Sequence, residues 1–199
     1  MKKFLLVLLS VFMCTSIYGQ AHMKFMGIPL NGTIEQFSQK LKTKGITYDA
    51  IASKKLSPGA KLYNGTFMGE HAQFVVMFNA KNRIVYGVGV ELTYSTKEFA
   101  RVPFLDIAEQ LHKKYPTAEF SSVEKTNKTI TGVNFLIPDV DSSQTLGIIM
   151  QTLDRPDGYL KKYWGINLIY MDVKNYKKNS DTNSDDLSLL SRLEIFRSE

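Results

Sequence analysis

The chain has 199 residues, a formal charge of +6 and a single cysteine, Cys14. This length is enough for one domain with a real core, or for two small domains that share an interface. A lone cysteine excludes an internal disulfide framework. If Cys14 is removed with an N-terminal leader, thiolate nucleophiles and cysteine metal sites are excluded as well.

The first 21 residues read as a signal peptide. Lys2 and Lys3 precede an apolar run of about ten residues and then small and polar residues, which is the order of a cleavable leader. A bilayer-spanning helix needs roughly twenty apolar residues, so we expect no transmembrane segment after cleavage. Cleavage fits after Gly19 or after Ala21, and bulky residues before Cys14 argue against lipidation.

The mature chain is expected to carry a charge of +4, because Lys2 and Lys3 supply two of the six charges. In an exported protein, basic charge favours acidic surfaces such as lipid headgroups or anionic polysaccharides over nucleic acid. The lysines are scattered along the chain, which favours a solvated basic surface without specificity. We therefore expect no nucleic-acid partner.

Residues 22–94 predict a helix followed by antiparallel strands. After an extended segment at 23–30, Thr33 and Gln36 form a capping-box pattern, and Gly45 ends the helix. The apolar stripe of this helix consists of Ile34, Phe37 and Leu41.

From Leu62 the apolar period changes to two, which is typical of strands. The alternation over 72–78 and 84–94 predicts a hairpin with a turn at 79–82. Gly87 and Gly89 favour a bulge or a strong local twist over a groove that holds a ligand.

Residues 95–173 repeat this order of helix and strands. Ser95 and Glu98 form a second capping-box pattern, and Pro103 predicts either a kink or a helix that starts afresh at that residue. Four strands are predicted at 119–124, 129–137, 145–153 and 163–173. Turn chemistry separates them at 126–128, 138–143 and 154–158.

The fold class is therefore α+β, with helices packed on antiparallel β-sheet and two similar helix-plus-sheet units in tandem, within one globular body. Residues 174–199 are predicted to be a polar linker and a short C-terminal helix. The polar stretch runs to Asp186. The apolar residues of that helix are Leu187, Leu189, Leu190, Leu193, Ile195 and Phe196. Such a short helix must dock on the domain, a partner or a membrane surface.

No motif forces a chemistry. The three histidines, His22, His71 and His112, lack a second ligand-type residue at metal-binding spacing. The acidic runs at 139–141 and 181–185 lack the glycine and the glutamate of a calcium loop. There is no phosphate-binding glycine loop and no nucleophile elbow. We predict no catalytic residue, no metal site and no cofactor.

One cluster has the composition of a binding site. Aromatic residues surround a lysine pair near the start of the last strand, and aromatic faces stack on sugars and anchor protein interfaces. The competing interpretation is core packing, because Trp164 begins an apolar alternation that continues through Tyr170. The candidate binding residues are Tyr159, Lys161, Lys162, Tyr163 and Trp164.

The segment 25–37, followed by Lys40, Leu41, Lys42 and Gly45, resembles the opening of uncharacterised exported proteins of Bacteroides-type gut bacteria. The similarity extends over 62–92 and 111–115, about two thirds of the chain, and implies no activity and no functional residues. The order of helix and antiparallel sheet is also similar, in topology alone, to beta-lactamase-inhibitor-like proteins and outer-membrane assembly lipoproteins.

These observations predict a periplasmic or secreted, non-enzymatic binding module. It would engage an envelope protein or polysaccharide through a sheet face or through the aromatic and lysine cluster. The alternative is a hydrolase that acts on carbohydrate or peptide, with acids far apart in the sequence. Two carboxyl groups facing each other across an open cleft would favour that alternative.

Overall fold

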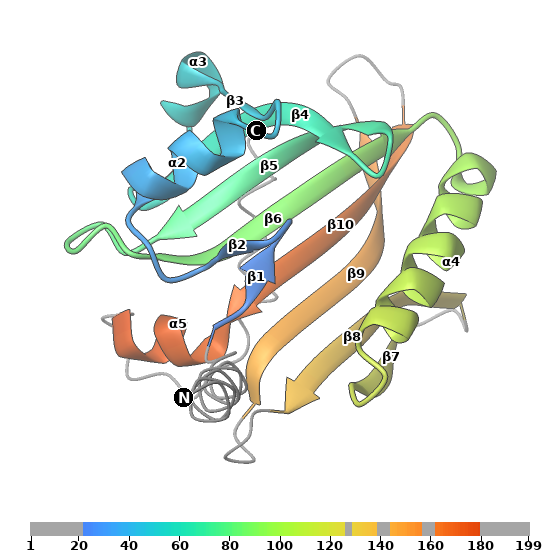
Figure 1. Ribbon diagram of the computed structural model, residues 1–199. Helices are drawn as coiled ribbons and strands as arrows, with labels where there is room; N and C mark the ends of the chain where they lie inside the picture. Colours follow the sequence, from blue (N-terminus) through green and yellow to red (C-terminus); the bar gives the residue numbers. More distant parts are fainter. Residues whose placement is uncertain (1–21, 126–128, 139–143, 157–161, 180–199) are drawn as a thin grey trace, which may run out of the picture.

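The computed structural model in Figure 1 describes residues 22–125, 129–138, 144–156 and 162–179. Residues 1–21 and 180–199, on which the predicted signal peptide and most of the predicted C-terminal segment fall, lie outside these ranges. In chain order the elements are β1 (Lys24–Phe25), β2 (Ile28–Pro29), α2 (Ile34–Lys42), β3 (Thr47–Tyr48), α3 (Ala50–Ser53), β4 (Ala60–Phe67), β5 (Glu70–Phe78), β6 (Val85–Tyr94), α4 (Lys97–Lys114), β7 (Glu119–Lys125), β8 (Thr129–Pro138), β9 (Gln144–Pro156), β10 (Lys162–Asp172) and α5 (Val173–Asn179).

Strands β3 to β10 form one antiparallel sheet in the order β3-β4-β5-β6-β10-β9-β8-β7. Each predicted half supplies a meander, β3 to β6 and then β7 to β10. The last strands of the two meanders, β6 and β10, pair with each other near the middle of the sheet. The prediction of an α+β fold with helices on antiparallel sheet is confirmed.

Helices α2 and α4 and the small hairpin β1–β2 pack on the same side of the sheet, the helical face (Figure 1). Alternate residues of β5, β6 and β10 point into this layer because successive side chains of a strand face opposite ways. Burying each large apolar side chain contributes about 1.5–3 kcal/mol. The buried residues from the sheet include Phe74, Val76, Val88, Val90, Leu92, Ile166, Leu168 and Tyr170, and the helices add Ile34, Phe37, Leu41, Ala100, Phe104, Ile107 and Leu111.

The opposite side of the sheet, the rear face, carries a second and smaller apolar cluster. Among the described residues, α3 lies at its β4 border and α5 lies where β6, β9 and β10 meet. The cluster consists of Leu62, Val75, Met77, Ile169, Met171, Val173 and Tyr176, with Ala52, Leu56, Ala60 and Tyr86 packed against it.

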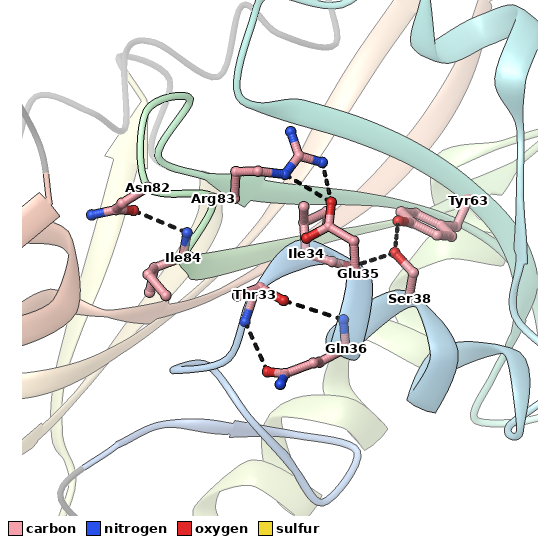
Figure 2. Close-up of polar contacts among 9 residues, drawn as sticks. All are labelled: Thr33, Ile34, Glu35, Gln36, Ser38, Tyr63, Asn82, Arg83 and Ile84. Carbon is pink, nitrogen blue, oxygen red and sulfur yellow. Dashed lines mark hydrogen bonds and ion pairs between the residues drawn. The ribbon is translucent and has the colours of Figure 1, made fainter.

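The first helix begins as the sequence predicts. Figure 2 shows the capping box, in which Thr33 and Gln36 satisfy each other's main-chain N–H groups through their side chains. The same helix is tied to the β5–β6 turn because Arg83 Nε donates to Glu35 Oε1 at 2.8 Å. It is also tied to β4 through a hydrogen bond between Ser38 and Tyr63.

The hairpin of β5 and β6 contains the irregularity that the glycines predict. Register shifts between Met77 and Phe78, opposite Gly87 and Val85. A side chain at Gly87 would come within 2.7 Å of the Met77 methyl group. The strand pairing is therefore irregular next to Gly87, in agreement with the interpretation as a bulge or a strong local twist.

The second helix differs from expectation at its start. Its N-cap is Thr96, whose side-chain oxygen accepts from Phe99 N at 3.3 Å, rather than Ser95. The helix runs continuously through Pro103, so a helix that starts afresh there is wrong. Pro103 lies in the second turn, where it removes one helix hydrogen bond and crowds the carbonyl of Phe99, so the kink stays a prediction.

Two predicted boundaries near the C-terminus are also wrong. Asp154, Arg155 and Pro156 continue β9 and pair with β10, so these three residues do not belong to the predicted turn. Residues 173–179 are helical rather than part of a polar linker, because Asp172 accepts a hydrogen bond from Asn175 N at 2.8 Å and so caps α5. Tyr176 then buries its ring against Tyr86.

Candidate functional site

A row of polar residues crosses the rear face in register. Asn64 stands opposite Gln73, Gln73 opposite Glu91, and Glu91 opposite Asn167 on four adjacent strands. Residues in register on antiparallel strands share a face. Because Val90 and Leu92 point into the helical core, Glu91 between them points to the rear. We call Asn64, Gln73, Glu91 and Asn167 the polar row.

The two members of the polar row near the middle of the sheet are buried, and the other two are not. Asn64 is half-buried and donates to Asp49 Oδ2 at 3.0 Å, and Gln73 is exposed. Glu91 is only 3% exposed and Asn167 only 1% exposed. Charged and amide side chains are rarely buried this completely without a specific reason.

Asn167 is the least satisfied member of the row. Neither its Oδ1 nor its Nδ2 has a hydrogen-bond partner among the residues that the structure describes. Leaving a buried polar group unpaired costs about 1–3 kcal/mol, so the fold is less stable than it would be with an apolar residue here. An amide offers both donors and an acceptor, so it suits a ligand that has both.

Gly165 lies beside this amide. A Cβ atom at residue 165 would meet no atom nearer than 3.8 Å beyond its chain neighbours, and would be 3.9 Å from both Asn167 Nδ2 and Glu91 Oε1. Thr93, the register partner of Gly165, is exposed. A methyl group at residue 165 would therefore be in ordinary contact with the two most buried polar groups of the row.

The rear face is apolar immediately beside the polar row. Two residues further along each strand, Val75, Gly89 and Ile169 lie in register. Val75 and Ile169 are 1% and 2% exposed. A ligand on this face would meet a polar strip and an apolar strip side by side, a pattern that suits an amphipathic protein segment.

A second polar cluster lies at the end of β10, on the helical face. Asp172 Oδ2 accepts from Met23 N at 3.1 Å and lies 2.8 Å from His22 Nδ1. Asn175 Nδ2 donates to Leu30 O at 2.7 Å. These bonds attach the start of the described chain to α5, so the cluster has a structural role.

The two buried carboxylates do not form a pair of the kind used in glycoside hydrolysis. The two buried carboxylates, Glu91 and Asp172, lie on opposite faces of the sheet. Paired catalytic carboxyls flank one bond about 5–10 Å apart. In the described part of the chain, no group of three or more His, Cys, Asp or Glu residues is placed to hold a metal ion.

The predicted aromatic and lysine cluster is only partly described. Tyr159 and Lys161 lie outside the described residues, and Lys162 and Tyr163 are placed as the first two residues of β10. Trp164 is half-buried and packs against the helical core, in line with Ile166, Leu168 and Tyr170. The core-packing interpretation thus holds for Trp164, and the binding role of the five residues stays a prediction.

Sequence reasoning missed the polar row. Alternation places Glu91 and Gln73 on the face away from the core, which normally means solvent, and it gives no sign that Glu91 is buried. The polar residue Asn167 inside an otherwise apolar strand, Ile166 to Met171, was the one available signal.

Comparisons with known proteins add no relative. No protein-family model, no curated protein and no solved structure matches the chain. Within the described ranges, no helix has both the length and the apolar character needed to cross a bilayer.

Proposed function

We propose that the protein is an exported, non-enzymatic binding module that recognises a protein partner of the cell envelope through its rear face. The leader-like start of the sequence supports export. The observation that carries the binding role is the buried amide of Asn167, which lacks a hydrogen-bond partner among the described residues. A residue that lowers the stability of the fold, with no local interaction to compensate, is typical of a functional site.

The geometry favours recognition over catalysis. The row offers hydrogen-bonding groups of a carboxylate and three amides, and the adjacent strip is apolar. Such a surface positions a partner by hydrogen bonds and gains affinity from apolar burial. It presents no histidine, thiol or second carboxylate beside Glu91 among the described residues of the row.

Two substitutions test this proposal. Asn167→Leu removes the amide at similar volume, and Gly165→Ala adds one methyl group in ordinary contact with Asn167 Nδ2 and Glu91 Oε1. We expect both variants to be at least as thermally stable as the natural protein, since one removes an unpaired polar group and the other removes a flexible glycine from a strand. Both should lose the partner in pull-downs from envelope extract.

The control is Gln110→Ala, on the exposed side of α4 and away from the rear face. It should retain the same proteins as the unsubstituted chain. If both rear-face variants fold and still retain the same set of proteins as the control, recognition through the polar row is wrong.

The aromatic and lysine cluster is tested separately. Tyr159→Ala should leave the melting temperature unchanged and reduce partner retention if the cluster binds. A lower melting temperature with proportionate loss of binding would instead support core packing.

A further inference from the structure

The positive charge of the chain is concentrated in one segment. Residues 36–69 contain six lysines, no arginine and a single acid, Asp49, so this segment carries +5 of the formal charge of +6. The charge is thus a local property of the segment rather than one spread evenly over the protein. The six lysines are Lys40, Lys42, Lys44, Lys54, Lys55 and Lys61.

The fold brings this segment to one border of the sheet. It forms most of α2 and all of β3, α3 and β4, and β3 is the outermost strand, next to β4 (Figure 1). Five of the six lysines are exposed, and Lys61 is half-buried. Among the described residues, none of the six forms an ion pair. The exposed ammonium groups therefore face solvent without a counter-charge from a described side chain.

The one acid of the segment is engaged in local hydrogen bonds. Asp49 Oδ1 accepts from Ile51 N at 3.1 Å and from Ala52 N at 2.9 Å, so this side chain caps α3. Asp49 Oδ2 accepts from Asn64 Nδ2 at 3.0 Å. The carboxylate therefore holds the N-terminal end of α3 in place rather than pairing with a lysine.

Two exposed apolar side chains lie among the lysines. Tyr48 is 50% exposed and Ile51 is 80% exposed. Lys61 Nζ lies 5.3 Å from the centre of the Tyr48 ring, so a cation and an aromatic face occur together. Ile51, Lys54 and Lys55 are three and four residues apart, which places them on one side of the α3 turn. We call the six lysines, together with Tyr48 and Ile51, the basic corner.

The basic corner is attached firmly to the sheet. Ser53 Oγ accepts from Leu62 N at 2.8 Å, and Asp49 N donates to Leu62 O at 2.9 Å, which fixes α3 to β4. The Tyr48 ring packs against the buried Tyr63 ring at 5.4 Å between centroids. The exposed groups are thus held in one arrangement, which lowers the entropy lost on binding.

We infer that the basic corner docks the protein on an anionic lipid surface. Clustered lysines are attracted to anionic headgroups, and each lysine near the surface contributes about fivefold in affinity. Tyrosine is favoured at the boundary between headgroups and hydrocarbon, and an exposed isoleucine beside it can enter the same layer. A soluble anionic polymer offers no such apolar layer, so Ile51 favours lipid. The basic corner shares no residue with the polar row, and the inference does not rest on the proposed function.

Vesicle sedimentation tests the inference with the full chain. The anionic vesicles contain equal parts of phosphatidylglycerol and phosphatidylcholine, and the reference vesicles contain phosphatidylcholine alone. Lys54→Gln combined with Lys55→Gln should weaken binding to the anionic vesicles about thirtyfold. The matched control, Lys113→Gln combined with Lys114→Gln, removes the same charge from the exposed end of α4. It should change binding by less than about twofold, because charges away from the contact are screened.

Equal losses from the two pairs of substitutions would show that binding follows overall charge, and the inference would be wrong. It would also be wrong if the natural chain bound the anionic vesicles no more strongly than the reference vesicles. Retention on dextran sulfate without binding to the anionic vesicles would assign the basic corner to a charged polymer and overturn docking on lipid.

A tryptophan reporter tests which side of the protein meets the lipid. Ile51→Trp places an indole on the exposed side of α3, and the matched control is Val102→Trp, at a residue of α4 that is 71% exposed. Trp164, the only natural tryptophan, is present in both variants. With the anionic vesicles, the emission of Ile51→Trp should shift to shorter wavelength because the indole leaves water, and the emission of Val102→Trp should not. No shift in Ile51→Trp, or an equal shift in both variants, would overturn docking through the basic corner.

Discussion

Asn175 connects α5 to two distant parts of the chain, and its removal should weaken the fold measurably. The side chain is only 7% exposed, and its Nδ2 donates to Leu30 O at 2.7 Å and to Val85 O at 3.0 Å. Asn175→Ala removes both bonds and leaves two buried carbonyls without this donor. Each lost bond costs about 1 kcal/mol net, and unpaired carbonyls raise this, so the expected loss is about 2–4 kcal/mol.

The assay is unfolding in urea and by heat, followed by circular dichroism. For a chain of this length, a loss of about 3 kcal/mol lowers the melting temperature by roughly 6–12 °C. Asn175→Asp should be at least as damaging, because a carboxylate would face two carbonyl oxygens. The control is Lys174→Ala on the exposed side of the same helix, which should change stability by less than about 0.5 kcal/mol.

An Asn175→Ala variant within about 0.5 kcal/mol of the unsubstituted protein would refute the reasoning. It would mean that the contact between α5 and the segment around Leu30 is not maintained in solution.

Three further predictions concern backbone strain and pH. Gly59 has a φ of +92°, and a Cβ there would lie 2.6 Å from a main-chain carbonyl oxygen. Gly69 has a φ of +86°, but a Cβ there would have no atom within 4 Å. In urea unfolding, Gly59→Ala should therefore lower the free energy of unfolding by at least about 1 kcal/mol more than Gly69→Ala. The Arg83 hydrogen bond lowers the pKa of Glu35 from 4.5 to about 2, so this pair stabilises the fold above pH 4.5 and the effect is lost as the pH falls through 2. Thermal melts of Glu35→Gln should accordingly decline less on acidification than those of the natural chain. Burial raises the pKa of Tyr94 from 10.0 to about 12, so stability is lost as the pH rises from 10 through 12, and Tyr94→Phe should reduce the alkaline loss in the same assay.

The sequence predicts the helical face well because the spacing of apolar residues indicates which side chains are buried on folding. Ile34, Phe37 and Leu41 recur at helical spacing and are buried, and the alternation from Ala72 to Phe78 marks the inward side of β5. Capping at Thr33 follows from local chemistry alone. Such features depend on neighbours within a few residues, which a sequence pattern contains.

The rear face could not be predicted in this way. Its burial depends on what lies over the sheet, and Glu91 reads as a solvent-facing residue in any alternating strand. The attachment of His22 to Asp172 joins residues that are 150 positions apart. The order of the strands also could not be predicted, because a repeat of helix and strands can form either two separate sheets or a single sheet.

The pairing of β6 with β10 creates the candidate site. Glu91 comes from the first meander and Asn167 from the second, and they meet only because the last strands of both meanders are neighbours. In two separate sheets, each residue would lie on a solvated edge strand, where an amide or carboxylate keeps most of its hydration. Joining the halves moves both groups to the centre of a wide face, where the side chains are buried and the amide of Asn167 has no hydrogen-bond partner among the described residues.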